Sequence, residues 1–368
     1  MSLVLDNVSK VVGGETHIAP MDLELESGSL SLLLGLTLSG KTSLMRLMAG
    51  LDKPSSGRIL VDGRDVTGLS VRKRNVAMVY QQFINYPSLT VYENIASPLR
   101  IAGVSSSEID RRVRAEAERL HIDAMLDRLP AELSGGQQQR TAMARALVRD
   151  AELVLLDEPL VNLDYKLRET LREELPKALE GRRSIVVYAT TDPWEALAFG
   201  GRTAVLEEGN LLQYDYAANV YSAPATTHVA SVFSDPPMNI IDGEIRGDEL
   251  RVGDSLRTAR PAALSSLSDG SYLFGVRPPH LTVNSDADKG GQRIDTAVDV
   301  TEISGSDTYV HCQVEGRPWV AVQPGVHQHD LGARLSLGFH PDKLFVFDRN
   351  EQLVHSPEAG ADRQDEGA

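Results

Sequence analysis

The chain has 368 residues, of which 42% are hydrophobic, and its formal net charge at pH 7 is −15. This length can form about two to three domains with apolar cores. The acidic charge argues against a nonspecific grip on nucleic acid, which needs a basic surface, and no stretch approaches the about 18 consecutive apolar residues of a membrane-spanning helix. The first residues lack the basic region and long apolar core of a signal peptide. We therefore expect membrane association only through a partner.

Residues 1 to about 83 alternate short apolar runs with turn signals, which predicts a β-rich edge. Leu30–Leu34 is an apolar run of strand length, the pattern Gly-x-x-x-x-Gly-Lys-Thr follows at 35–42, and apolar residues then recur at helical spacing over 43–49. Strand, glycine turn and helix are the setting of a phosphate-binding loop, whose N–H groups and helix N-terminus face the phosphates. Lys41 would reach the β- and γ-phosphates, and the Thr42 hydroxyl would ligate magnesium. The nucleotide-binding residues predicted here are Gly35, Leu36, Thr37, Leu38, Ser39, Gly40, Lys41, Thr42 and Ser43.

From about 84 to 150 the pattern becomes helical, with a helix start at Ser105-Ser-Ser-Glu108. The segment Ser134-Gly135-Gly136-Gln137 begins another helix that runs toward Val148. Ser134 is a good N-cap, and the N-terminal end of the helix dipole favours an anion. A helix cap alone explains the serine but not the Gly-Gly-Gln that follows it.

The run Leu153–Leu156 has no polar residue, which is typical of a parallel strand buried on both faces. Asp157 and Glu158 follow at its carboxyl end, where open α/β sheets bind their ligands. Asp157 is then placed to hold magnesium, and Glu158 to orient or deprotonate a water that attacks the γ-phosphate. Further strands are predicted at 184–188 and 203–206, and the Asp235-Pro-Pro237 break marks the end of this domain.

Residues 236–350 contain short β-like runs between Gly, Asp and Ser, which predict a small barrel. The predicted strands are 240–245, 272–276, 297–303, 308–314, 317–322 and 343–347. Cys312 lies in one of them and is expected to be a buried, unpaired thiol in a reducing compartment. The polar, acidic segment 351–368 is predicted to be a disordered tail.

These motifs, in this order, resemble the ATP-binding subunit of an ABC transporter, and among these the ATPases of carbohydrate and polyol importers. The resemblance covers residues 1 to about 348. It depends on five stretches: Tyr80-Gln81-Gln82, Pro87 to Ile95, Leu133 to Arg140, Leu155 to Pro159, and Phe274 to Leu281.

The resemblance implies an α/β fold, with a P-loop nucleotide-binding domain at 1–235, its helical subdomain at about 84–150, and a TOBE-like, OB-like β-barrel regulatory domain at 236–350. It implies that ATP and Mg²⁺ bind, that Gln81 contacts the magnesium together with Thr42 and Asp157, and that Glu158 is catalytic. It also implies that Ser134, Gly135, Gly136 and Gln137 contact the ATP of a second ABC subunit.

Further partners follow from the same resemblance. The segment Phe83 to Leu89 would contact one of two membrane-embedded permease subunits, and a periplasmic or surface substrate-binding protein would complete the complex. The chain would then lie on the cytoplasmic face of the inner membrane. No nucleic-acid partner is expected.

Four positions depart from the family pattern. Thr191 stands where the family has a switch histidine, and its hydroxyl cannot carry a positive charge to the γ-phosphate. Val161 replaces a serine in the loop after Pro159, although Asp164 is retained for contact across the subunits. Val12 stands where an aromatic residue usually stacks on adenine, and Leu38 replaces a glycine of the phosphate loop.

Two interpretations of Thr191 remain open: a dimer with a different, histidine-bearing ATPase, which we favour, or a slowly hydrolysing homodimer. Similarity to the paired ATP-binding subunits of bacterial glycerol importers makes glycerol the leading cargo, with sugars and glycerol phosphates as alternatives. A rival of another class is a regulatory module that closes on ATP without turning it over. We assign no transition metal to the histidines and expect His280 to be structural. Trp194 could pack in the core or meet the subunit partner, and we favour the core.

Overall fold

The structure, a computed structural model, describes residues 1–82, 84–161, 163, 165–179, 183–254, 256–284 and 291–357. The chain forms two compact units, Met1–Ala217 and Ala218–Ala368. The boundary therefore precedes the predicted one at 235–236. The short helices α7 (Ala217–Ser222) and α8 (Thr227–Val232) belong with the second unit. The buried Arg277 guanidinium explains this, because it donates to the Phe233 carbonyl at 3.1 Å and stacks 3.7 Å from the centre of the Tyr221 ring.

A six-stranded sheet forms the centre of the first unit, in the order β10-β9-β3-β8-β7-β6. Its strands are parallel except β10, which pairs antiparallel with β9. Strands β7 and β8 are buried along their whole length, as the apolar run at 153–156 predicts. The strands are β3 (Leu30–Leu34), β6 (Val76–Val79), β7 (Leu153–Asp157), β8 (Ile185–Thr190), β9 (Arg202–Glu207) and β10 (Asn210–Tyr216).

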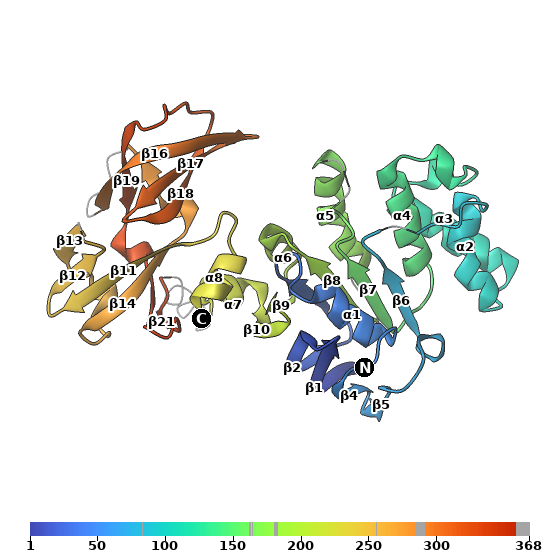
Figure 1. The fold of residues 1–368 in the computed structure, drawn as a ribbon. Coiled ribbons are helices and arrows are strands. Elements are labelled where there is room, and N and C mark those ends of the chain that lie inside the picture. The colour runs from blue at the N-terminus through green and yellow to red at the C-terminus, as the bar shows by residue number, and fades with distance from the viewer. Residues whose placement is uncertain are drawn as a thin grey trace, which may run out of the picture. The chain divides into compact units, whose positions relative to one another are not determined.

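Helices accompany this sheet in two groups (Figure 1). The first is α1 (Lys41–Ala49), α5 (Tyr165–Leu179) and α6 (Pro193–Phe199), which are connected to its strands. The second, beside β6, is α2 (Val91–Ile101), α3 (Ser106–Arg119) and α4 (Gly135–Leu147), all within the stretch predicted to be helical. Thr90 and Ser134 begin α2 and α4 with capping boxes, in which each side chain accepts from a backbone N–H.

An antiparallel sheet in the order β2-β1-β4-β5 completes the first unit. It consists of β1 (Ser2–Val12), β2 (Glu15–Glu26), β4 (Ser56–Val61) and β5 (Arg64–Asp65). Two backbone hydrogen bonds connect this sheet to the phosphate loop through Gly209: Ala19 N donates to Gly209 O, and Gly209 N donates to Ser39 O, both at 3.0 Å. The N-terminal sheet is thereby held beside the phosphate loop.

The second unit contains two antiparallel sheets, ordered β13-β12-β11-β14-β20-β21 and β15-β19-β16-β17-β18. Its apolar core includes Trp319, Phe274 and the predicted buried thiol of Cys312. The strands of the first sheet are β11 (Asn239–Arg246), β12 (Glu249–Val252), β13 (Leu256–Ala259), β14 (Gly270–Val276), β20 (Phe345–Phe347) and β21 (Leu353–His355). Those of the second are β15 (Thr282–Val283), β16 (Gln292–Ser304), β17 (Asp307–Val314), β18 (Arg317–Pro324) and β19 (Arg334–Phe339).

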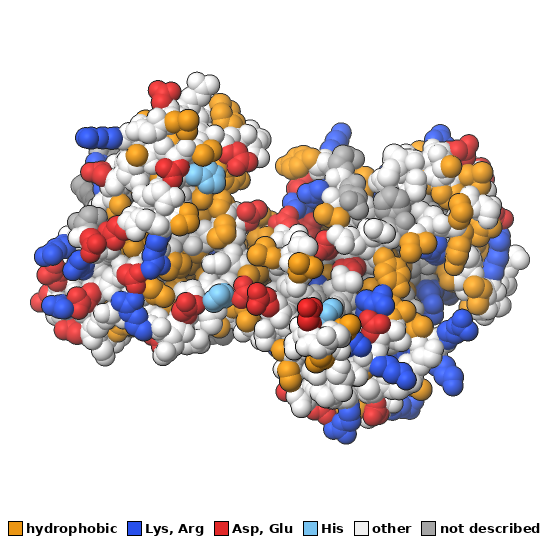
Figure 2. Space-filling model, viewed as in Figure 1, with side chains coloured by type: hydrophobic (Ala, Val, Ile, Leu, Met, Phe, Trp, Pro, Cys, Tyr) orange, Lys and Arg blue, Asp and Glu red, His pale blue; other side chains and the backbone are white. Residues whose placement is uncertain are grey.

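The second unit differs from the sequence prediction in two respects. Strands β12, β13, β15, β19 and β21 were not predicted. Strand β21 pairs with β20, so the prediction of a tail from 351 is wrong for residues 353–355, while 358–368 lie outside the described residues. On the face drawn in Figure 2, acidic and basic side chains of this unit are interspersed. Asp242 of this unit forms ion pairs with Arg317 and Arg349.

Candidate active site

The phosphate loop joins β3 to α1 and requires glycine at both of its ends. A Cβ on Gly35 would lie 2.3 Å from the Leu206 carbonyl oxygen, and Gly40 has a φ of 101°. Leu38 is left-handed as well, with a φ of 71°, and its side chain is 93% exposed. A leucine at this φ is strained, which agrees with the glycine that the family has there. The α1 N-terminus, starting at Lys41, follows directly.

Side chains from three segments meet at the carboxyl edge of the parallel sheet. The buried Lys41 Nζ donates to the carbonyl oxygens of Gly35 at 2.6 Å and Leu36 at 3.0 Å, and lies 3.5 Å from Glu158 Oε1. Thr42 Oγ1 donates to Asp157 Oδ2 at 2.8 Å. Gln81, just after β6, donates from Nε2 to Glu158 Oε2 at 2.9 Å. The sequence-predicted lysine, threonine, glutamine and two acids are therefore in mutual contact.

Burial shifts the pKa values of two side chains in this cluster. Burial lowers the pKa of Lys41, and the nearby Glu158 carboxylate partly opposes this effect. Burial also raises the pKa of Asp157, although the hydrogen bond from Thr42 opposes the shift. Both effects reflect charged groups that burial removes from water. A phosphate beside Lys41 or a cation beside Asp157 would stabilise the charged form of each side chain.

A magnesium ion fits these residues. Asp157 Oδ1 is buried and makes no hydrogen bond among the described residues, so it retains a free acceptor. Magnesium is usually bound by one or two carboxylates together with substrate phosphates and water, and the Thr42 hydroxyl and Gln81 amide are oxygen ligands of the same kind. Within the described part of the chain, no three His, Cys, Asp or Glu side chains gather as a self-sufficient metal site.

A cavity of about 510 Å³ lies over the phosphate loop. Four of its lining residues come from outside the sequence motifs: Glu15, Thr16 and His17 of β2, and Glu208 of the β9–β10 turn. No local motif marks these positions, because they approach the loop only through the docking of β2 and β9. Val12, the position predicted to contact the base, does not line the cavity and is 47% exposed.

The segment Ser134–Gln137 lies at the N-terminus of α4 and does not line this cavity. Ser134 Oγ accepts from Gln137 N at 3.3 Å, and Gln137 Oε1 accepts from Ser134 N at 2.9 Å. Close packing restricts Gly136, since a Cβ there would lie 3.1 Å from a Leu163 methyl. The predicted contact of this helix end with the ATP of another subunit stays a prediction. Asp164, predicted to contact that subunit too, lies outside the described residues.

Thr191 follows β8 at the same edge of the sheet. Its predecessor Thr190 pairs with Leu34 at the end of β3, and Gly35 N donates to the Thr190 carbonyl. Thr191 itself does not line the cavity. The prediction that Trp194 packs in the core is wrong, because its side chain is 46% exposed. Helix α6 buries Glu195 and Ala196, and Trp194 lies outside that buried face.

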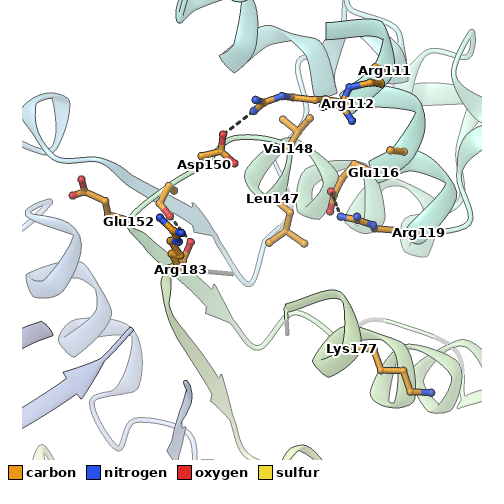
Figure 3. Close-up of a pocket in the computed structure, with 13 residues that line it drawn as sticks. Arg111, Arg112, Glu116, Arg119, Leu147, Val148, Asp150, Glu152, Lys177 and Arg183 are labelled. Carbon is orange, nitrogen blue, oxygen red and sulfur yellow. Dashed lines mark hydrogen bonds and ion pairs between the residues drawn. The ribbon is translucent and has the colours of Figure 1, made fainter. Parts of the chain in front are cut away.

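A larger cavity, of about 660 Å³, lies away from the phosphate loop and is lined by α3, the end of α4 and neighbouring segments (Figure 3). Two of its arginines are paired: Arg112 with Asp150 at 2.8 Å and Arg119 with Glu116 at 3.3 Å. Lys177 lies apart from the arginines (Figure 3). This cavity has no pair of groups suited to phosphate chemistry. No helix among the described residues is both long enough and apolar enough to cross a membrane.

Comparison with known proteins relates both units to the same group. The ABC transporter profile matches residues 18–161, and the TOBE domain profile matches 274–347. The sn-glycerol-3-phosphate import ATP-binding protein UgpC of Chromobacterium violaceum is 35% identical over 354 residues, covering 95% of each chain. The trehalose/maltose import ATP-binding protein MalK of Thermococcus litoralis is 37% identical over 360 residues, or 94% of this chain and 97% of the relative.

Solved structures resemble the first unit. The dimeric structure of MJ0796, a bacterial ABC transporter cassette, superposes with a TM-score of 0.54 at 29% identity, covering 58% of this chain and 98% of that one. A post-hydrolysis state of the same cassette, bound to ADP and Pi, gives a TM-score of 0.53.

Proposed function

The chain belongs to the ABC transporter family, among its import ATP-binding proteins, and on this basis we propose that it binds ATP with Mg²⁺ and hydrolyses it to drive import of glycerol or a related polyol, glycerol phosphate or sugar. The observation that carries the proposal is the contact cluster of Lys41, Thr42, Gln81, Asp157 and Glu158 at the carboxyl edge of a parallel sheet. A phosphate loop, a strand-end acid pair and a glutamine supply what phosphoryl transfer to water needs.

The residues have separate tasks in the proposed mechanism. Lys41 exchanges its two carbonyl acceptors for phosphate oxygens, and the N–H groups of the loop and α1 hold the same phosphates. Glu158 orients the attacking water and accepts its proton, and the Gln81 amide, already on Glu158, keeps that carboxylate directed at the γ-phosphate. Thr42, Asp157 and Gln81 would hold magnesium, which neutralises the charge that develops on the phosphates.

The proposal includes a second ABC subunit. Ser134 to Gln137 present a helix N-terminus away from this chain's own cavity, which suits the γ-phosphate of ATP bound to another subunit. Thr191 favours a non-identical partner that retains the switch histidine, so that the dimer would have one strong and one weak hydrolytic site. A homodimer with slow hydrolysis is the alternative, and an ATP-binding regulatory subunit with little hydrolysis is the candidate of another class that Thr191 also favours.

The permease contact is proposed at residues 84–89, since Phe83 lies outside the described residues. Ile84 is 59% exposed and Tyr86 is 48% exposed, which leaves apolar surface for a partner. Asn94 fixes this segment by accepting from Tyr86 N at 2.8 Å and donating to Tyr86 O at 3.1 Å. We place the chain at the cytoplasmic face of the inner membrane, with two permease subunits and a periplasmic or surface substrate-binding protein.

The first test is magnesium-dependent ATP hydrolysis by the purified chain, alone and with an ABC ATPase subunit that carries the switch histidine. Glu158→Gln is the matched control, because it keeps ATP binding and removes the proton acceptor. A Glu158-dependent rate supports the ATPase. ATP binding with no hydrolysis in either setting would instead support the regulatory subunit.

Cargo requires a separate test. Deleting the gene should abolish uptake of one labelled compound among glycerol, sn-glycerol 3-phosphate and maltose, and a plasmid copy should restore it where Lys41→Ala does not. Unchanged uptake of all three would refute the proposed cargo class without affecting the ATPase result.

A further inference from the structure

We propose that His17 provides the stacking surface for the nucleobase, in the place of the aromatic residue that Val12 has lost. This inference rests on the proposed function, since it concerns the ATP that the phosphate loop would bind. The ligand group is the flat base of a nucleoside triphosphate.

Residues of β2 form part of the lining of the cavity over the phosphate loop. The groups suited to the γ-phosphate, namely Gln81 and Glu158, lie at one part of the lining, while Glu15, Thr16 and His17 supply the part contributed by β2. A nucleotide with its phosphates on this loop can place its base against the β2 residues of the same cavity.

His17 has the only ring among the described residues that line this cavity. Its side chain is exposed in the absence of a ligand, so a base can cover it. Histidine is one of the aromatic side chains on which nucleic-acid bases stack, because every base offers a π-face. Glu15, two residues before His17 on β2, also lines the cavity and adds a carboxylate acceptor to its lining.

The backbone keeps His17 at a fixed place. A Cβ on Gly209 would lie 2.5 Å from the His17 carbonyl oxygen, and a Cβ on Gly40 would lie 3.2 Å from it. Gly209 also accepts from Ala19 N and donates to Ser39 O. Backbone contacts on both sides therefore tie the segment around His17 to the phosphate loop. The backbone that carries His17 therefore needs little further ordering when the ring meets the base.

Calorimetric titration with ATP and, separately, with tripolyphosphate tests the inference, because tripolyphosphate has no base. His17→Ala should weaken ATP binding about fivefold or more and leave tripolyphosphate binding unchanged, as expected for the lower end of measured base stacking. His17→Phe should bind ATP at least as tightly as the unmodified chain. His121→Ala, which removes an exposed histidine paired with Glu174, should change neither titration.

Three results would overturn the inference. ATP affinity could be unchanged in His17→Ala, it could fall equally with tripolyphosphate affinity, or Val12→Ala could show the base-specific loss instead. Lys41→Ala separates the two proposals, since it should weaken both ligands. If the unmodified chain bound no ATP, the proposed function would fail together with this inference. If Lys41→Ala weakened ATP binding and His17→Ala did not, this inference alone would fail.

Discussion

The carboxylate of Glu195 should stabilise the loop that carries Thr191. Glu195 is 6% exposed, and its Oε2 accepts from the hydroxyls of Tyr188 at 2.9 Å and Thr190 at 2.7 Å, both of which are buried. Thr190 Oγ1 in turn accepts from Asp192 N at 3.0 Å. The turn after β8 therefore depends on this buried acceptor and on Arg172, which pairs with Asp192 and whose Nε lies 3.6 Å from Glu195 Oε1.

The size of the effect follows from the number of donors left unpaired. Glu195→Ala leaves two buried hydroxyls without an acceptor, at about 1–3 kcal/mol each, so the free energy of unfolding should fall by about 2–6 kcal/mol. Glu195→Gln keeps an acceptor oxygen and removes the charge, and should cost less than about 1 kcal/mol at neutral pH. The matched control is Glu169→Ala, which removes a 44% exposed partner of Arg172 and should cost about 0.5 kcal/mol or less.

Burial raises the pKa of Glu195, so the ionised carboxylate is disfavoured in the folded state. A group with a raised pKa loses its stabilising contribution as the pH rises through its folded-state pKa. Glu195→Gln resembles the protonated form at every pH. Its stability relative to the unmodified chain should therefore improve as the pH rises from the acidic range, where glutamate is protonated in both states, to neutral.

Urea denaturation of the purified chain, followed by circular dichroism at several pH values, measures these differences. The reasoning would be refuted if Glu195→Ala matched the Glu169→Ala control, or if Glu195→Gln were as unstable as Glu195→Ala. A relative stability of Glu195→Gln that declined with rising pH would contradict the electrostatic part alone.

Three further predictions concern separate parts of the molecule. Thr191→His should raise magnesium-dependent ATP hydrolysis by the chain alone, by up to about 10²–10³ if the histidine supplies a full transition-state contact; an unchanged rate would show that Thr191 is not the limiting group. Gly209→Ala should lower both stability and nucleotide affinity, because φ there is 79° and the new Cβ would lie 2.5 Å from the His17 carbonyl oxygen; denaturation and ATP titration measure both, and unaltered values would contradict the predicted clash. Cys312 should resist iodoacetamide at pH 8 and react in urea, since burial raises the pKa of its thiol to about 11. Mass spectrometry measures the labelling, and rapid labelling of the native chain would contradict this prediction.

The local motifs of the active site could be predicted from the sequence because each is read within one strand, turn or helix. The phosphate loop at 35–42 and the acids after Leu156 lie where the pattern of strand and turn puts them. Parallel pairing of β6 and β7 then brings Gln81 to the same edge as Glu158. In such a sheet, a residue that follows a buried strand is already close to its counterparts on neighbouring strands.

Other features escaped prediction because they depend on contacts between distant segments. The cavity positions of His17 and Glu208 result from the docking of β2 against the β9–β10 turn, which no periodicity reveals. Trp194 was misjudged because a seven-residue helix leaves little pattern from which to infer its buried face. The predicted end of the first unit, residue 235, lies after the observed end at Ala217. Arg277 binds the Phe233 carbonyl across 44 residues of chain, and the local sequence pattern does not reveal such a contact.

The strand order has a consequence for synthesis on the ribosome. Strand β3, which ends at the phosphate loop, lies between β8 and β9, and both of these are made long after it. Until residue 207 has emerged from the ribosome, β3 lacks the complete strand β9 as a neighbour. The bond from Gly209 N to Ser39 O also cannot form before that point. A nascent chain therefore carries its phosphate-loop residues long before it can use them, and it gains affinity for nucleotide late, when almost the whole first unit is available to fold around β3.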